Sequence, residues 1–248
     1  MDVATAMPDL KAALARDGCP ICFLSRQAEQ RYLRYLVREG PNDSAALTLL
    51  AQSLGLCREH AWAMGRLEPE LYGSSLATSI ICRNLVQEVE ARLQGYIERL
   101  SSWRTPGWRR LLHLPAHPPP PRELVPDGGC RVCQMGESAA RAYSAWLLAA
   151  LSGPQASLRE QYGHPASLCL PHLRLALGSV GSETVGAALF LARESAARLT
   201  ALDHNLGEYG DKHAWERRSE LVGVAEEDSV RQALAFLSGD DGTDGRGA

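Results

Sequence analysis

The chain has 248 residues, of which 45% are hydrophobic and 22% are charged, and its formal net charge is −3 at pH 7. This composition is that of an ordinary globular protein, and the nearly neutral charge argues against binding nucleic acid through overall electrostatics. No apolar run reaches the roughly 20 residues that a membrane-spanning helix needs. The N-terminal sequence MDVATAMPDLKAAL has no basic stretch before an apolar one, so we expect no secretion and a cytoplasmic location without membrane contact.

The first half of the chain is predicted to be helical, because Ala and Leu are abundant and β-branched residues are sparse. Apolar residues recur at helical spacing after Cys22, and Asn42 or Asp43 can cap the next helix. A third helix is expected to start at Cys57. The fourth and longest is expected over residues 70–100. Its predicted buried stripe comprises Leu76, Ile80, Ile81, Leu85, Val89, Leu93, Ile97 and Leu100.

A proline-rich connector follows, and helical patterns return beyond it. The connector contains four consecutive prolines, Pro118 to Pro121, which favour a stiff polyproline II conformation. After it, helices are expected over residues 139–151, 156–162, 170–177 and 184–202. A capped amphipathic helix is expected over residues 225–237. The apolar side chains expected to face the protein from this last helix are Val230, Leu234 and Leu237.

These elements predict an all-α protein in four parts. The parts are a first helical module (1–104), a linker (105–129), a second helical module (130–206), and a C-terminal wrap with a final helix and an acidic tail (207–248). The tail ends in SGDDGTDGRGA, which is expected to be disordered because it offers almost nothing to bury.

Two sets of cysteine and histidine repeat along the chain. The first half reads C-x2-C-x34-C-x2-H, and the second half reads C-x2-C-x35-C-x2-H. Tyr32 and Leu36 match Tyr143 and Leu147 at the offset of 111 residues that separates the first cysteine pairs. We therefore predict an internal repeat, with two tandem modules related by a pseudo-twofold axis. The two sets are Cys19, Cys22, Cys57 and His60, and Cys130, Cys133, Cys169 and His172.

Each set has the residue types of a closed Cys3His zinc site. Zinc binds four such ligands in a tetrahedron, and C-x2-C presents two sulfurs from one turn. The N-terminus of the following helix favours the thiolate form of these cysteines. The C-x2-H pair has i,i+3 spacing, so both side chains share a helical face. We expect each set to close within its own copy, so that one zinc joins the first helix of a module to its third.

Other interpretations of the cysteines stay open. The CPIC sequence at residues 19–22 resembles the dithiol of thioredoxin-like oxidoreductases, but the βαβ context of that fold is absent. A Cys3His set can also hold an iron–sulfur cluster. A catalytic zinc is disfavoured, because four protein ligands leave no position for water or substrate.

Three further features have a structural interpretation and a functional one. Cys82, in the longest helix, is expected to be a small core residue rather than a redox or metal group. The aromatic and basic stretch WRTPGWRRLLHL at residues 103–114 is expected to pack on a helical bundle rather than to contact nucleic acid. One group of acidic and histidine residues could form a second metal or acid–base site. We expect this group instead to belong to a polar, partly helical segment that packs around the helical bundle. This group comprises Asp203, His204, Glu208, Asp211 and His213.

Several quoted stretches together resemble an uncharacterised bacterial family, domain-of-unknown-function family 6062. They are CPICFLSRQAEQRYLRYLVREGPND, GLCREHAW, GSSLATSIICRNLV and YGDKHAW with EEDSVRQALAFLSG. The sharpest points of the resemblance are the first cysteine and histidine set and its repetition in the second half. It implies a bacterial, cytosolic and mainly helical protein, and it implies no activity.

The sequence thus favours a non-enzymatic protein. No phosphate-binding Gly-rich loop, G-x-S-x-G or H-E-x-x-H motif is found, so we expect no catalytic residue and no organic cofactor. The preferred function is a scaffold stabilised by two zinc ions that binds a protein partner. The alternatives are a redox- or metal-responsive regulator that uses zinc thiolates, and an electron carrier or enzyme with an iron–sulfur cluster.

Overall fold

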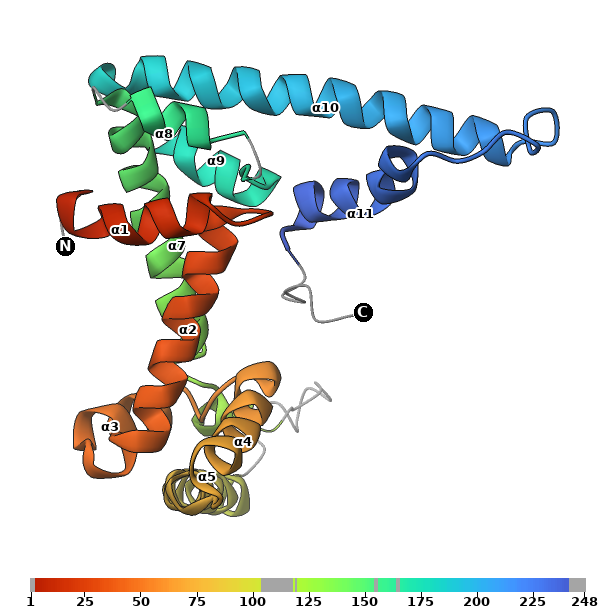
Figure 1. Ribbon diagram of the computed structural model, residues 1–248. Helices are drawn as coiled ribbons and strands as arrows, with labels where there is room; N and C mark the ends of the chain where they lie inside the picture. Colours follow the sequence, from red (N-terminus) through yellow and green to blue (C-terminus); the bar gives the residue numbers. More distant parts are fainter. Residues whose placement is uncertain (1–2, 104–117, 119, 154–155, 164–165, 241–248) are drawn as a thin grey trace, which may run out of the picture. The chain divides into compact units, whose positions relative to one another are not determined.

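The structure is a computed structural model that describes residues 3–103, 118, 120–153, 156–163 and 166–240. Every regular element in this part of the chain is a helix (Figure 1), which confirms the all-α prediction. No helix within it is long and apolar enough to cross a membrane. The α-helices are α1 (Val3–Leu14), α2 (Pro20–Arg38), α3 (Ser44–Gln52), α4 (Arg58–Tyr72), α5 (Leu76–Ser102), α7 (Arg131–Ser152), α8 (Ala156–Gln161), α9 (Leu170–Gly178), α10 (Val185–His213) and α11 (Val224–Ser238). Short 3-10 helices are η1 (Gly40–Asn42), η2 (Arg122–Leu124) and η3 (Ser182–Thr184).

The helices form two compact units that differ from the predicted modules. The α10 unit combines Met1–Ala28 with Gly136–Ala248, and the α5 unit is Glu29–Met135. The difference arises because α2 begins in the α10 unit and ends in the α5 unit, whereas α7 runs the opposite way. Each half of the sequence therefore contributes residues to both units. The internal repeat stays a prediction from the sequence.

The core of the α10 unit is built by α1, α2, α7, α8, α9 and α10 together with the segment before α9. Its interior is almost entirely aliphatic, and burying one such side chain stabilises the fold by about 2 kcal/mol. One polar contact secures α1, because the hydroxyl of Tyr143 donates to the carboxylate of Asp9 at 2.7 Å. The largest fully buried side chains here are Leu10, Leu14, Ile21, Leu24, Leu147, Leu148, Leu151, Leu158 and Leu168.

The α5 unit is organised by the turn between α2 and α3. The carboxylate of Asp43 accepts from the backbone N–H groups of Ala45 and Ala46. Of the two caps that the sequence allows for α3, Asn42 and Asp43, the structure uses Asp43. The core of the α5 unit is smaller than that of the α10 unit. The buried residues are Leu33, Leu36, Val37, Ala46, Leu50, Met64, Ile81 and Val132.

A buried carboxylate joins α4 to α5. Gly73 ends α4 with φ +67°, a conformation that glycine adopts without strain. Ser75 makes no side-chain hydrogen bond at the start of α5. Instead Glu68, only 2% exposed, accepts from the N–H groups of Ala77 and Thr78, each at 2.7 Å. Glu68 therefore satisfies two N–H groups that the helix itself leaves without a partner.

The prediction that the apolar stripe of α5 is buried is wrong for most of the helix. Ile81 is fully buried, and Ala77 beside it is nearly so. Beyond Leu85, the side of the helix that faces α3 and η2 is the more buried one. The apolar side chains do not lie on that side, because each comes one residue after a more buried position and so points about 100° away from it. Cys82 is likewise exposed, so the prediction that it lies in the core is wrong. The exposed apolar residues of α5 are Leu76, Ile80, Val86, Val89, Leu93, Ile97 and Leu100.

Part of the predicted linker packs on α5. The guanidinium of Arg99 donates to the carbonyl of Pro120 at 2.9 Å and pairs with Glu123. Arg92 donates to the backbone carbonyl of Glu123 at 3.4 Å. Residues 120–135 consequently belong to the α5 unit, whereas most of the stretch at residues 103–114 lies outside the described residues.

The C-terminal elements form a hairpin of α10 and α11. Helix α10 continues to His213, past its predicted end at residue 202, and the final helix lies where the sequence predicts it. Ser229 of α11 is fully buried. The apolar residues expected to face the protein are instead partly exposed, which corrects that prediction. They are Val230, Leu234 and Leu237, exposed by 41%, 62% and 57%.

We predict that Glu68→Ala lowers the free energy of unfolding by about 2 kcal/mol, because it leaves two N–H groups unpaired. Burial raises the pKa of the Glu68 carboxyl, but the N–H donors outweigh it and hold that pKa below its usual value. The contribution of Glu68 is therefore complete above the unfolded pKa of about 4.3 and is lost as the pH falls through the folded pKa. Urea titrations at pH 7 and pH 3 measure both effects.

The matched control is Glu70→Ala on the same helix, because Glu70 is exposed and surface substitutions change stability by less than about 0.5 kcal/mol. An equal loss of stability in both variants would contradict the role of Glu68.

Candidate metal centres

Four side chains from two distant segments form the first centre. Cys19 lies just before α2 and Cys22 in its first turn, while Cys169 is the N-cap of α9 and His172 lies in that helix. Nδ1 of His172 is 3.5, 3.3 and 3.1 Å from the sulfurs of Cys19, Cys22 and Cys169. The sulfurs of Cys22 and Cys169 are 3.7 Å apart. All four residues belong to the α10 unit.

The second centre has the same composition within the α5 unit. Cys57 is the N-cap of α4 and His60 lies in its first turn, while Cys130 and Cys133 stand at the start of α7. Nδ1 of His60 is 3.2, 3.7 and 3.3 Å from the sulfurs of Cys57, Cys130 and Cys133. The sulfurs of Cys57 and Cys133 are 3.8 Å apart.

These distances fit the corners of a tetrahedron around one ion. With metal–sulfur bonds of about 2.3 Å and a metal–nitrogen bond of about 2.0 Å, two sulfurs lie about 3.8 Å apart and sulfur and nitrogen about 3.5 Å apart. In each centre the four ligand atoms all lie within 4.8 Å of one another. The residues present therefore fit a single tetrahedral metal ion.

The pairing of the segments corrects the expectation from sequence. Each C-x2-C was expected to meet the C-x2-H of its own half, but the structure joins residues 19–22 to residues 169–172, and residues 130–133 to residues 57–60. The physical reason is that α2 and α7 start in different units from the ones in which they end. Each C-x2-C, at the start of its helix, thus lies with the C-x2-H of the other half.

Burial and mutual contact set the pKa values in the first centre. Burial, followed by hydrogen bonds with Cys169 and Cys22, raises the pKa of the Cys19 thiol, while hydrogen bonds from its neighbours lower that of Cys22. Burial alone would lower the pKa of His172, but contact with the Cys169 and Cys22 thiolates raises it to about 9. Without an ion, these groups balance their charges by sharing protons, and a bound cation would displace those protons.

The second centre shows the same competition at the start of α7. Burial opposes ionisation of Cys130, but backbone N–H groups, those of Cys133 and Cys57 foremost, lower its pKa to about 7. Burial and the charge of Cys130 raise the pKa of Cys133 to about 12. Two adjacent thiolates are therefore unstable without a positive charge between them.

A carboxylate stands behind the histidine of the second centre. Nε2 of His60, the ring nitrogen that faces away from the sulfurs, is 3.8 Å from the carboxylate of Glu29. At 3.8 Å the two groups make no hydrogen bond, but the carboxylate lies on the side of the ring where a metal-binding imidazole usually has its outer partner. Sequence reasoning missed Glu29, because it lies seven residues beyond the nearest cysteine and belongs to no ligand motif.

The acidic and histidine residues near the end of α10 form no such centre. In the part of the chain that the structure describes, only the two Cys3His groups bring three or more potential ligands together. Arg217 instead pairs with Glu208, Asp211 and Glu220, and His213 contacts the carbonyl of Tyr209. This segment is thus an ion-paired structure around the α10–α11 turn.

Comparison with known proteins gives one match. A model of a family of unknown function, DUF6062, matches residues 4–240. The chain belongs to the DUF6062 family. The resemblance inferred from the sequence is thereby confirmed, and the match covers both centres. Searches of curated proteins and of solved structures found no match to this DUF6062 protein.

The pairing across the two halves is tested by Cys57→Ser in this DUF6062 protein. We predict that this variant exposes Cys130 and Cys133 to alkylation by N-ethylmaleimide, because their centre loses a ligand, while Cys19 and Cys22 stay protected. Peptide mass spectrometry after a short pulse of reagent measures both pairs. Cys169→Ser is the reciprocal variant and should expose Cys19 and Cys22 alone. Exposure of Cys19 and Cys22 by Cys57→Ser would instead support pairing within each half.

Proposed function

We propose that this DUF6062 protein is a non-enzymatic helical scaffold that two structural zinc ions stabilise and that binds a protein partner in the cytoplasm. The observation that carries the proposal is the pair of tetrahedral Cys3His groups. Four protein ligands complete the coordination of zinc, so neither centre keeps a position for a reacting water. The ligands of each centre would be Cys19, Cys22, Cys169 and His172, and Cys57, His60, Cys130 and Cys133.

The chemistry of the ligand set favours zinc. Three thiolates and one imidazole suit zinc, and carboxylate-preferring cations such as Mg²⁺ do not bind such a set. The ligands of an iron–sulfur cluster are divided among several irons with sulfide between them, which places some ligand atoms far apart. Here all four ligand atoms lie within 4.8 Å, which supports one ion per centre.

Metal binding would stabilise contacts that the helices alone make weakly. Each centre links two segments that are separated by at least 70 residues of chain, as in the pair Cys130 and His60. An ion that binds only the folded arrangement adds its binding free energy to the stability of the fold. This effect matters most for the α5 unit, because its core is the smaller of the two.

The exposed side of α5 supports a protein partner. Val86, Val89, Leu93, Ile97 and Leu100 lie on a common side of the helix, each more than a third exposed. An amphipathic helix of a partner protein is the ligand that such a stripe accommodates. The formal charge of −3 falls further with three thiolates on each zinc, which disfavours nucleic acid.

The first prediction of this proposal is that purified protein contains two zinc ions per chain and absorbs no visible light. Elemental mass spectrometry and an absorption spectrum of an anaerobically purified sample measure this. Removing the metal with a chelator is expected to lower the melting temperature, because the ligands then repel one another. Iron with acid-labile sulfide would overturn the zinc assignment and support the iron–sulfur alternative.

A partner is tested with a photo-crosslinking amino acid at position 93, on the exposed side of α5. We expect it to capture a defined protein in cells, and Val89→Glu to abolish that product because a charge enters the apolar contact. Arg83→Glu, on the same helix but off the stripe, is the matched control. A product unaffected by Val89→Glu would show that the stripe does not bind the partner.

A redox-responsive regulator is the second candidate, and the three half-buried cysteines of the second centre favour it. Thiolates within reach of peroxide can be oxidised reversibly, and oxidation releases zinc. Zinc loss on mild peroxide treatment, with a change in helicity that a reductant reverses, would distinguish a regulator from a fixed scaffold.

A further inference from the structure

The end of α11 lies directly against the sulfurs of the first centre. Gly239 follows α11 with φ +93° and ψ 167°, a conformation that only glycine adopts readily. A Cβ atom at Gly239 would be 3.2 Å from the sulfur of Cys22 and 3.8 Å from that of Cys169. The backbone at Gly239 therefore packs directly against the side of the centre that Cys22 and Cys169 form.

The next residue, Asp240, attaches the chain to the third cysteine of the same centre, Cys19. The carboxylate of Asp240 accepts from the backbone N–H of Cys19 at 2.8 Å and lies 3.7 Å from the guanidinium of Arg26. This contact also needs a glycine, because a Cβ at Gly18 would be 2.8 Å from Asp240 Oδ2. Two glycines and an ion pair thus hold residues 239 and 240 on the first centre.

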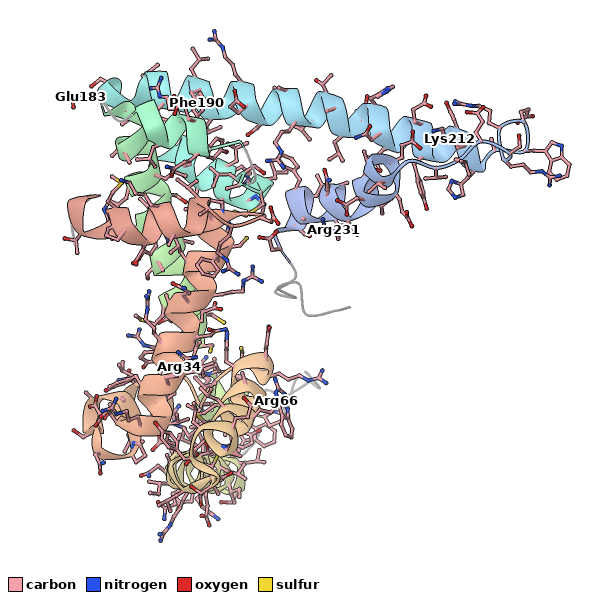
Figure 2. The ribbon with its side chains drawn as sticks, viewed as in Figure 1. Arg34, Arg66, Glu183, Phe190, Lys212 and Arg231 are labelled. Carbon is pink, nitrogen blue, oxygen red and sulfur yellow. The ribbon has the colours of Figure 1, made fainter. Side chains whose placement is uncertain are left out.

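Helix α11 contacts two neighbouring helices, but few of its own apolar side chains are buried. It packs along α10 and touches α9, the helix that carries His172, and Figure 1 shows it folded back beside α10. Lys212, labelled in Figure 2 near the end of α10, pairs with Glu226 at the start of α11. Four apolar side chains of α11, those of Val224, Val230, Leu234 and Leu237, are exposed, and that of Phe236 is half-buried. Few buried apolar contacts imply that α11 separates from the α10 unit more readily than the core unfolds.

The two centres differ in how well their thiols are enclosed. Cys19 and Cys169 of the first centre are 4% and 2% exposed, and its third cysteine, Cys22, is half-buried. In the second centre all three cysteines are half-buried. The enclosure of the first centre includes residues 239–240, which lie 217 residues beyond Cys22 in the chain.

We propose that Gly239 and Asp240 form a cover that controls how readily metal and reagents exchange at the first centre, which loses its metal only when α11 separates from α9 and α10. The proposal rests on the metal-binding function above and adds a regulatory element to it. The second centre has more exposed thiols and is the one that exchanges first. Metal loss or oxidation would then begin at the second centre, while the first keeps the α10 unit folded.

The test uses the zinc-loaded full chain and N-ethylmaleimide, with each cysteine followed by peptide mass spectrometry. In the wild type, the cysteines of the second centre are expected to react faster than those of the first. Gly239→Ala is expected to raise the rates at Cys19, Cys22 and Cys169 about tenfold, the lower end of the effect of losing outer contacts to a metal site, and to leave the second centre unchanged.

The matched control is Gly207→Ala, the same substitution in α10, where an added Cβ would meet nothing within 4 Å. It is expected to leave all rates unchanged. Asp240→Ala keeps Gly239 in place and removes the contacts with Cys19 and Arg26, so it should raise the same three rates. Unchanged rates in both cover variants, or an equal rise at both centres, would overturn the proposal.

The test separates the cover from the metal-binding function. If elemental analysis finds no metal, the proposed function fails, but the rates still report on the cover because residues 239–240 contact the thiol-bearing segments themselves. If two zinc ions are found and Gly239→Ala changes no rate, the metal centres stand and the cover is refuted.

Discussion

The gathering of three sulfurs and one imidazole at two points is the constraint on which the other features depend. Thiolates at 3.1 to 3.8 Å from one another and from an imidazole nitrogen repel unless protons or a cation neutralise them. The helices must hold these side chains together against this repulsion, and a bound metal ion offsets the free energy that doing so costs. The starts of α2, α4, α7 and α9 are fixed by this requirement, because every ligand lies at or just before the first turn of one of them.

Helix N-termini suit this role for a physical reason. Their first N–H groups have no partner within the helix and stabilise negative charge nearby. At Cys130 this effect is strong enough to lower the pKa to about 7 against the effect of burial. The same principle operates away from the metal at Glu68, where a carboxylate takes the place of a thiolate at the start of α5.

The two centres have the same kinds of ligand, three cysteines and one histidine, but different surroundings. The second has the carboxylate of Glu29 3.8 Å from Nε2 of His60, and its thiols are half-buried. The first has the backbone of Gly239 on its sulfurs and Asp240 on the N–H of Cys19. A cover over one centre slows exchange there and not at the other, so one chain can hold two ions of the same kind that differ in lability.

The sequence by itself determined the helical class, a helix cap at Asn42 or Asp43, the final helix and the eight residues that meet in the centres, since local spacing and helix-end chemistry depend on near neighbours. Only the tertiary structure decided which C-x2-C meets which C-x2-H, because that depends on the paths of α2 and α7 rather than on spacing. It also decided that Cys82 and most of the α5 stripe are exposed, because periodicity identifies an apolar side but not whether another helix covers it. The contact of residues 239–240 with Cys19 is long-range, and no local pattern predicts it.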